Sequence, residues 1–173
     1  MTVELVGPQG LAGQPVSVGS IAIVAPQRVF TVPSPQYPRA ETLGAKARLL
    51  GYDLSSAHLH PGETLDLTLY WQALAPFDTG YTVFVHFLDR SGQVRVVCDN
   101  VPAAGNRPTT GWLPGEVVAD EHAIPISPGI SAGEYAIEVG LYEAQGGSRL
   151  PVYDAQGARA EQDRILLSGI TVE

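Results

Sequence analysis

The segment from Val94 to Asp120, VRVVCDNVPAAGNRPTTGWLPGEVVAD, constrains the fold of this chain more than any other. It begins and ends with apolar runs that alternate in the manner of β-strands, and the loop between them is rich in Pro, Gly and Thr. The loop also contains one tryptophan, Trp112. A loop of this length between two strands is typical either of a cap on a β-sandwich or of the rim of a binding site.

The composition predicts one β-rich domain over residues 1–173. The 173 residues include 19 Gly and 14 Pro but a single lysine, Lys46, a balance that favours turns over long amphipathic helices. A hydrophobic content of 45% excludes disorder, yet no apolar run approaches the roughly 18 residues of a membrane span. We therefore expect a soluble chain that does not itself insert into a membrane.

Charge and cysteine content exclude several further classes of protein. A formal net charge of −8 leaves no basic surface for nucleic acid or for anionic membranes. Cys98 is the single cysteine, so the chain forms neither an internal disulfide nor a thiolate metal cluster. The N-terminus, MTVELVGPQG, lacks the basic start and apolar centre of a signal peptide, so it does not indicate a location.

About ten segments have the period-two alternation and the flanking turn residues of strands, and none sustains helical periodicity. We therefore predict an all-β fold: an antiparallel, jelly-roll-like β-sandwich. Residues 1–40 contain two strands and a proline-rich extended stretch, and we expect this N-terminal arm to lie on the body formed by residues 41–173. The ten segments are 16–26, 27–38, 46–54, 65–72, 81–89, 93–99, 116–126, 134–143, 148–154 and 164–172.

Two strands have informative faces. In 65–72 the apolar residues alternate, which predicts one core face that ends on a buried Trp71. In 81–89 both faces are largely apolar, which predicts a strand inside a sheet. The faces opposite the core can form either a polar and aromatic binding surface or a second buried layer beneath the N-terminal arm. The residues on these faces are Tyr70, Gln72, Thr82, Phe84, His86, Glu138 and Tyr142.

The order of the strands and the pattern D-x-x-P-x-x-G-x-x-P-T-x-x-W-x-P-G-E-V-V-x-D over residues 99–120 resemble one family. This family is the C-terminal β-sandwich domain of bacterial multi-pass membrane glycosyltransferases similar to dolichyl-phosphate-mannose-protein mannosyltransferases. The resemblance runs from about Val16 to the end of the chain, and residues 99–120 are its most specific part. It implies an extracytoplasmic accessory domain, tethered to the cell membrane in the full-length protein, whose parent carries its acidic catalytic residues in the membrane portion.

Trp112 has two interpretations. Its indole can stack on the apolar face of a sugar ring, or it can plug the end of the sandwich and hold the long loop in place. We favour the plug, because large aromatic side chains in ordered loops usually bury their surface.

The histidines and acids of the chain are weaker candidates. His58 and His60 have the spacing of metal ligands on a strand, but they adjoin a Pro-Gly turn, and we interpret them as surface residues. His86 lies among apolar neighbours, which predicts a half-buried histidine with a hydrogen-bond partner. A structural calcium ion held by Asp99, Asn100, Asp120 and Glu121 is one option, and carboxylates that accept hydrogen bonds from the loop backbone are the favoured alternative.

These observations favour a non-catalytic accessory domain that binds or positions a glycan or a glycosylation acceptor beside the membrane portion of its parent. The alternatives are a structural or protein-interaction domain without a ligand and, less favoured, a carbohydrate-active enzyme, since nucleophile-elbow, Walker and zinc-protease motifs are absent. No cofactor is expected apart from the calcium option. The candidate ligand-binding residues are Trp112, Asp99, Arg107, Thr109, Asp120, His86 and Tyr70.

Overall fold

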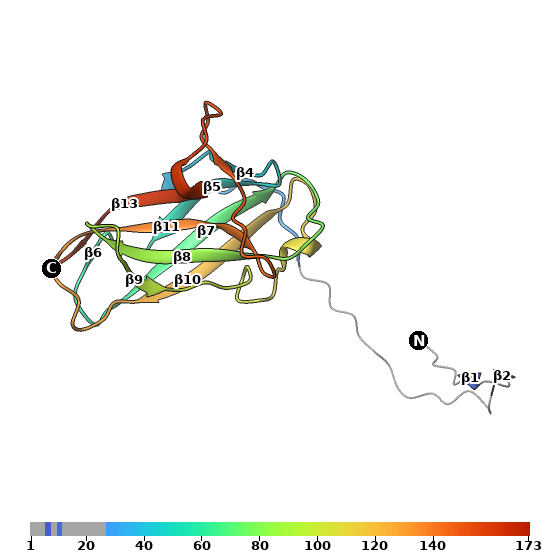
Figure 1. Cartoon of the computed structure of the whole chain (residues 1–173), viewed down its shortest axis with the longest axis horizontal. Coiled ribbons are helices and arrows are strands. Elements are labelled where there is room, and N and C mark those ends of the chain that lie inside the picture. The colour runs from blue at the N-terminus through green and yellow to red at the C-terminus, as the bar shows by residue number, and fades with distance from the viewer. Residues whose placement is uncertain (1–5, 8–9, 12–26) are drawn as a thin grey trace.

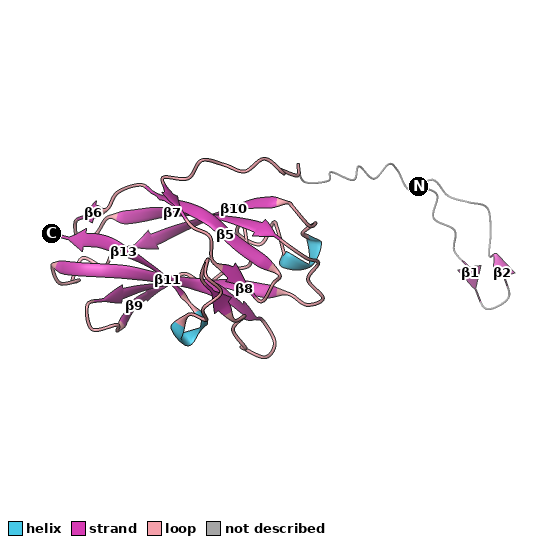
Figure 2. Cartoon of the chain, turned by 90° about the horizontal axis from the view of Figure 1, so that it is seen from above, coloured by secondary structure: helices cyan, strands magenta, loops and turns pink. Residues whose placement is uncertain are grey.

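The computed structural model describes residues 6–7, 10–11 and 27–173, and two β-sheets packed face to face form its main body (Figures 1 and 2). The all-β sandwich predicted from the alternation is confirmed. Strands β1 (Val6–Gly7) and β2 (Gly10–Leu11) pair with each other in a separate small sheet. The strand predicted over residues 16–26 lies outside the described residues.

The first sheet has six strands, paired antiparallel throughout. Its path is β10 (Val117–Pro125), β7 (Thr64–Ala73), β5 (Ala47–Leu54), β4 (Thr42–Leu43) and β12 (Val152–Tyr153), and β3 (Tyr37–Pro38) also pairs with β5. Strand β7 has the predicted alternation, because Leu65, Leu67, Leu69 and Trp71 are all buried in the core. The expectation that Trp71 is a core residue is therefore confirmed.

The second sheet has five strands in the order β6 (His58–Leu59), β13 (Ile165–Val172), β11 (Gly133–Glu143), β8 (Tyr81–Asp89) and β9 (Val94–Val97). The β13–β6 pair is parallel, and the other pairs are antiparallel. Strand β8 lies between β11 and β9, as its two apolar faces predict: Val83, Val85 and Phe87 enter the core, whereas Phe84 is buried on the opposite face.

The long loop between β9 and β10 closes one end of the sandwich. Trp112, which follows the short 3₁₀ helix η1 (Thr109–Gly111), is only 2% exposed. Its indole N–H donates to the carbonyl oxygen of Arg107 at 2.8 Å, and its ring meets Phe77 edge-on with the ring centroids 5.6 Å apart. The indole is thus placed as a plug and offers no open face for stacking on a sugar.

A buried carboxylate fixes the same loop to the N-terminal segment. Glu116 is fully buried and forms ion pairs with Arg107 of the loop and with Arg28 of the segment that precedes β3. It also accepts the backbone N–H of Leu113 at 2.9 Å. Beside it, the backbone N–H of Val117 donates to Val29 at 2.7 Å, so this part of the N-terminal segment lies along the edge of β10.

The burial of Trp112 predicts a large loss of stability when the indole is removed. We expect Trp112→Ala to lower the free energy of unfolding by about 3–5 kcal/mol, because it leaves a cavity and releases the loop. Urea denaturation measures this difference. The neighbouring Leu113→Ala is the control, since Leu113 is 46% exposed and its truncation leaves no buried cavity. Equal stability of the two variants would contradict the plug.

Candidate functional site

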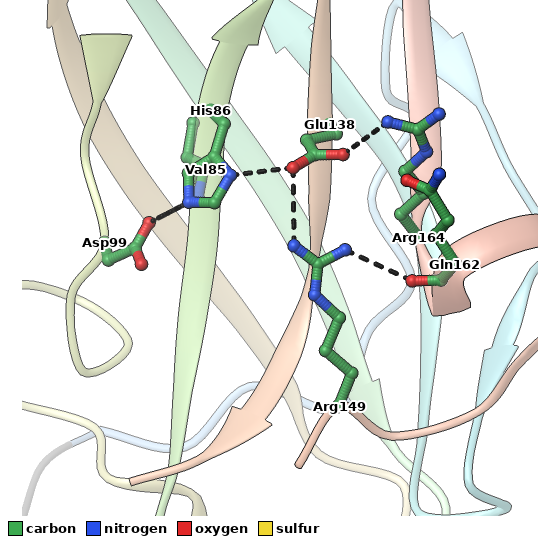
Figure 3. A network of polar contacts seen from close by, with 7 residues as sticks. All are labelled: Val85, His86, Asp99, Glu138, Arg149, Gln162 and Arg164. Atoms are coloured by element: carbon green, nitrogen blue, oxygen red, sulfur yellow. Dashed lines mark hydrogen bonds and ion pairs between the residues drawn. The ribbon is translucent and has the colours of Figure 1, made fainter. Parts of the chain in front are cut away.

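A network of charged side chains occupies the outer face of the five-stranded sheet, on the side away from the core (Figure 3). His86 on β8 and Glu138 on β11 are directly opposite each other in the strand register. Arg164, just before β13, and Arg149, between β11 and β12, both point at Glu138. Asp99, in the loop after β9, lies on the other side of His86.

His86 is held between two carboxylates. Its Nε2 atom lies 3.1 Å from Oδ1 of Asp99, and its Nδ1 atom lies 2.7 Å from Oε1 of Glu138. Ionised carboxylates only accept hydrogen bonds, so the two contacts are both satisfied when the imidazole carries two protons and a positive charge. The prediction that His86 is half-buried with a hydrogen-bond partner is confirmed.

Glu138 is the centre of the network, with 6% of its side chain exposed. Burial by itself would raise the pKa of its carboxyl group, but the hydrogen bonds from Arg164 and His86 and the charge of Arg149 outweigh burial. Arg164 donates to Oε2 at 2.7 Å, and Arg149 approaches Oε1 at 3.4 Å. The pKa of Glu138 is therefore lower than its ordinary value, and the carboxylate stays ionised at neutral pH.

An aromatic cluster borders this network. The ring of Phe84 occupies the space beside Gly140, where an added Cβ atom would come within 2.5 Å of Cζ. The guanidinium of Arg149 lies 4.0 Å from the centroid of the Phe84 ring, and Tyr142 packs nearby with its ring centroid 6.5 Å away. The Phe84 ring is therefore covered by Arg149, with which it forms a cation–π contact, and it does not offer a stacking face to a ligand.

All seven residues predicted on faces opposite the core lie on such faces, but they do not form one surface, because they are divided between the two sheets. Thr82, Phe84, His86, Glu138 and Tyr142 share the outer face of β8 and β11. Tyr70 and Gln72 belong to β7 of the other sheet, because β7 pairs with β5 and β10 rather than with β8. Tyr70 donates its hydroxyl to Asp53 at 2.7 Å, and this hydrogen bond, with burial, raises the pKa of Tyr70 to about 12.

A hollow of about 500 Å³ adjoins the network on the same sheet face. Its lining includes Leu88, Ala136 and Leu166, from three neighbouring strands, together with Ser168. Arg164 contributes to both the hollow and the network. The volume lies within the range of about 300–1,000 Å³ that is usual for small-molecule sites.

The other predicted ligand-binding residues lie apart from this face and have structural contacts. Thr109 is buried and accepts the backbone N–H of Tyr81 at 3.0 Å, while Arg107 pairs with Glu116. Asp120 is also buried, and its carboxylate contacts the backbone N–H of Ala103 at 2.7 Å and the His122 ring at 2.9 Å. Of the predicted set, only His86 and Asp99 meet in the network.

The calcium option is not supported by the arrangement of its residues. Asp99 binds His86 and the backbone N–H of Val85, whereas Asp120 bonds to the buried Trp71 and His122. Within residues 6–7, 10–11 and 27–173, no group of three or more His, Cys, Asp or Glu side chains has the geometry of a metal site. The alternative is confirmed for Asp120, which accepts the backbone N–H of Ala103 in the long loop, whereas the backbone donor to Asp99 is Val85 on β8.

His58 and His60 are exposed, as predicted. The Nδ1 atom of His58 lies 2.8 Å from the hydroxyl of Thr171, and that of His60 lies 3.3 Å from the carbonyl oxygen of Glu173. Both histidines therefore contact the C-terminal strand region and have surface roles.

Three charged residues of the site and cap were not predicted: Arg149, Arg164 and Glu116. Arg149 is a single charge between Ser148 and Leu150, Arg164 directly follows Asp163, and Glu116 lies in the pattern of residues 99–120 without a signal for its partners. Their partners come from other elements, so the pairings become visible only when the strand order is known.

Comparison with known proteins identifies a similar fold. The C-terminal domain of wzt matches with a TM-score of 0.55 and 15% identity, over 81% of this chain and 82% of that chain. A second structure, of AvmM, which catalyses macrocyclization in alchivemycin A biosynthesis, matches with a TM-score of 0.39 and 15% identity, over 78% and 95% of the two chains. The AvmM match is too distant to bear on the interpretation. No protein-family model and no curated sequence matches the chain.

At 15% identity the wzt domain supports the fold and not a shared ligand. The wzt domain is a β-rich C-terminal domain, which agrees with the kind of domain that the resemblance implies. The resemblance to mannosyltransferases has no match among the family models. In the described part of the chain, no helix has the length and apolar character needed to cross a bilayer.

The lowered pKa of Glu138 predicts a pH-dependent contribution to stability. Its stabilising effect is present above the ordinary carboxyl pKa and is lost as the pH falls through the lower folded-state value. We expect Glu138→Gln to cost about 1.5–3 kcal/mol of unfolding free energy at neutral pH, and the cost to shrink as the pH falls below the ordinary glutamate pKa of 4.5. Urea denaturation across a pH series measures both effects.

Glu134→Gln is the matched control, because Glu134 is an exposed glutamate on the same strand. This variant should change stability by less than about 0.5 kcal/mol. A cost of Glu138→Gln that is the same at acid and neutral pH would contradict an ionised, paired Glu138.

Proposed function

We propose that this chain is a non-catalytic accessory domain of a membrane glycosyltransferase, located outside the cytoplasm, and that the outer face of its five-stranded sheet binds a glycan. The observation that carries the proposal is the hollow beside a charged network whose side chains are already fixed by one another. The transferase setting rests on the resemblance of residues 99–120 and of the order of strands.

The chemistry of the hollow suits a sugar. Leu88, Ala136 and Leu166 provide apolar surface for the C–H groups of a pyranose, and Arg164 provides hydrogen-bond donors for its hydroxyls. The Nη1 atom of Arg164 donates a hydrogen bond to Glu138, and the other N–H donors of Arg164 have no hydrogen-bond partner among the described residues. Because Glu138 fixes the guanidinium, little side-chain entropy is lost when a ligand binds.

The charge of the hollow favours an uncharged ligand. Arg90 and Arg164 are balanced by Asp89 and Glu134 around its rim. The chain as a whole carries a formal charge of −8, which repels polyanions. A neutral glycan is therefore a better match than a phosphorylated or acidic one.

The ionisation of Glu138 argues against a role for this residue as the general acid of a glycosidase. Cleavage of a glycosidic bond requires a carboxylic acid that is still protonated near neutral pH, hence a raised pKa. The pKa of Glu138 is lowered instead. Its partners hold it as an anion that positions Arg164 and His86.

A glycan-array screen tests this function with a variant that fills the hollow. Ser168→Trp places an indole into the hollow from an exposed position, so we expect the fold to persist and array binding to be lost. Ala119→Trp is the control, because it adds the same side chain at an exposed position on β10 of the other sheet. Retained binding by a folded Ser168→Trp variant would contradict the assignment to this face.

A second function is favoured by exposed aliphatic residues on the same sheet face. Val97 is 59% exposed, and Val94 and Leu166 are each 43% exposed. Exposed apolar groups of this kind are typical of protein contacts. A domain that stabilises its parent through this face would bind nothing on the array, and Val97→Asp would reduce its co-purification with the membrane portion of the parent.

A further inference from the structure

We infer that the ligand is an extended, uncharged saccharide chain, which passes from the hollow on the five-stranded sheet over Arg164 to the edge of the six-stranded sheet. The inference rests on the proposed function and specifies the ligand of the same site. It follows from two additional hollows that continue the first.

The three hollows share their boundary residues. A second hollow of about 250 Å³ shares Arg164 and Leu166 with the first. A third, of about 420 Å³, shares Arg39, Glu41 and Asp154 with the second. The sequence of hollows therefore leads from β8 and β11, over the start of β13, to the segment between β3 and β4. A compact ligand needs one concave pocket, whereas a row of adjoining hollows matches a chain of linked units.

Hydrogen bonds and ion pairs fix the segments that border the path. Asp154 accepts the backbone N–H groups of Gln156 and Ala158 at 2.9 and 2.8 Å, which closes the turn after β12. Arg159 forms a two-bond ion pair with Asp163, at 2.8 and 2.7 Å, beside the 3₁₀ helix η2 (Glu161–Asp163). The path is thus bordered by fixed polar groups, which reduces the entropic cost of ordering it around a ligand.

The charges along the path exclude an anionic chain. The two additional hollows contribute Glu41, Asp154 and Glu161 but, beyond the shared Arg164, only Arg39. Arg39 is already paired with Glu41. Excess carboxylates repel a polyanion but accept hydrogen bonds from the hydroxyls of a neutral sugar.

The test measures affinity against chain length. Isothermal titration calorimetry is performed with size fractions of linear mannan, dextran and galactan, from the monosaccharide to long chains. For at least one of these polymers we expect the affinity per chain to rise about tenfold or more between the shortest and the longest fractions, and then to level off.

Two filling variants locate the path. Ala155→Trp fills the third hollow from an exposed turn, and we expect it to weaken binding of the long fractions to the level of the short ones while binding of the short fractions is unchanged. Ser168→Trp should abolish binding at every length. Ala119→Trp is again the control and should match the wild type.

The outcomes separate the inference from the proposed function. No binding by any fraction would contradict the proposed function itself. Equal affinity for short and long fractions, or full binding of long fractions by Ala155→Trp, would overturn the inference and leave a compact glycan site. Competition by an excess of gelatin would show that the path takes an extended polypeptide, which also overturns the inference.

Discussion

A carboxylate removed from water must find positive or hydrogen-bonding partners, and this requirement organises the sandwich beyond its apolar core. Glu116, Asp120 and Glu138 are each at most 5% exposed. Glu116 joins the long loop to the segment before β3, and Glu138 joins β8, β11 and the start of β13. Each buried acid thus connects segments that are distant in the sequence, in a chain whose single cysteine cannot form an internal disulfide.

The same requirement separates the cap from the candidate site. The carboxylate oxygens of Asp120 and Glu116 accept hydrogen bonds from loop residues and contact neighbouring buried groups. The long loop is thereby fixed as a structural cap on one end of the sandwich. Glu138 instead faces outward, beside a hollow, and its partners retain partial exposure. Asp99 connects the two regions, because it begins the long loop and also contacts His86.

Alternation in the sequence was sufficient to predict the main strands and their inner faces, as Trp71 on β7 shows. Burial of apolar side chains follows a period of two, so each long strand carries its own signal. The two-residue strands β4 and β6 were not predicted, because so short a segment has no period to detect. The candidate site was predicted only in part: His86 was found as a polar residue among apolar ones. Arg149 and Arg164 were missed, and Tyr70 was misplaced, because strand order is not encoded in the period of any single strand.

The close fit of Phe84 against Gly140 links two positions that are 56 residues apart in the sequence and adjacent in the sheet. The ring occupies the volume that a side chain at position 140 would need, so the two positions share one fixed space. In descendants of this sequence, a larger residue at 140 should be accompanied by a smaller one at 84. The loss of the Phe84 ring would also remove the cation–π contact of the Arg149 guanidinium. Positions 84 and 140 should therefore vary together in sequences that keep this charged face. Neither position alone would show that the face is kept.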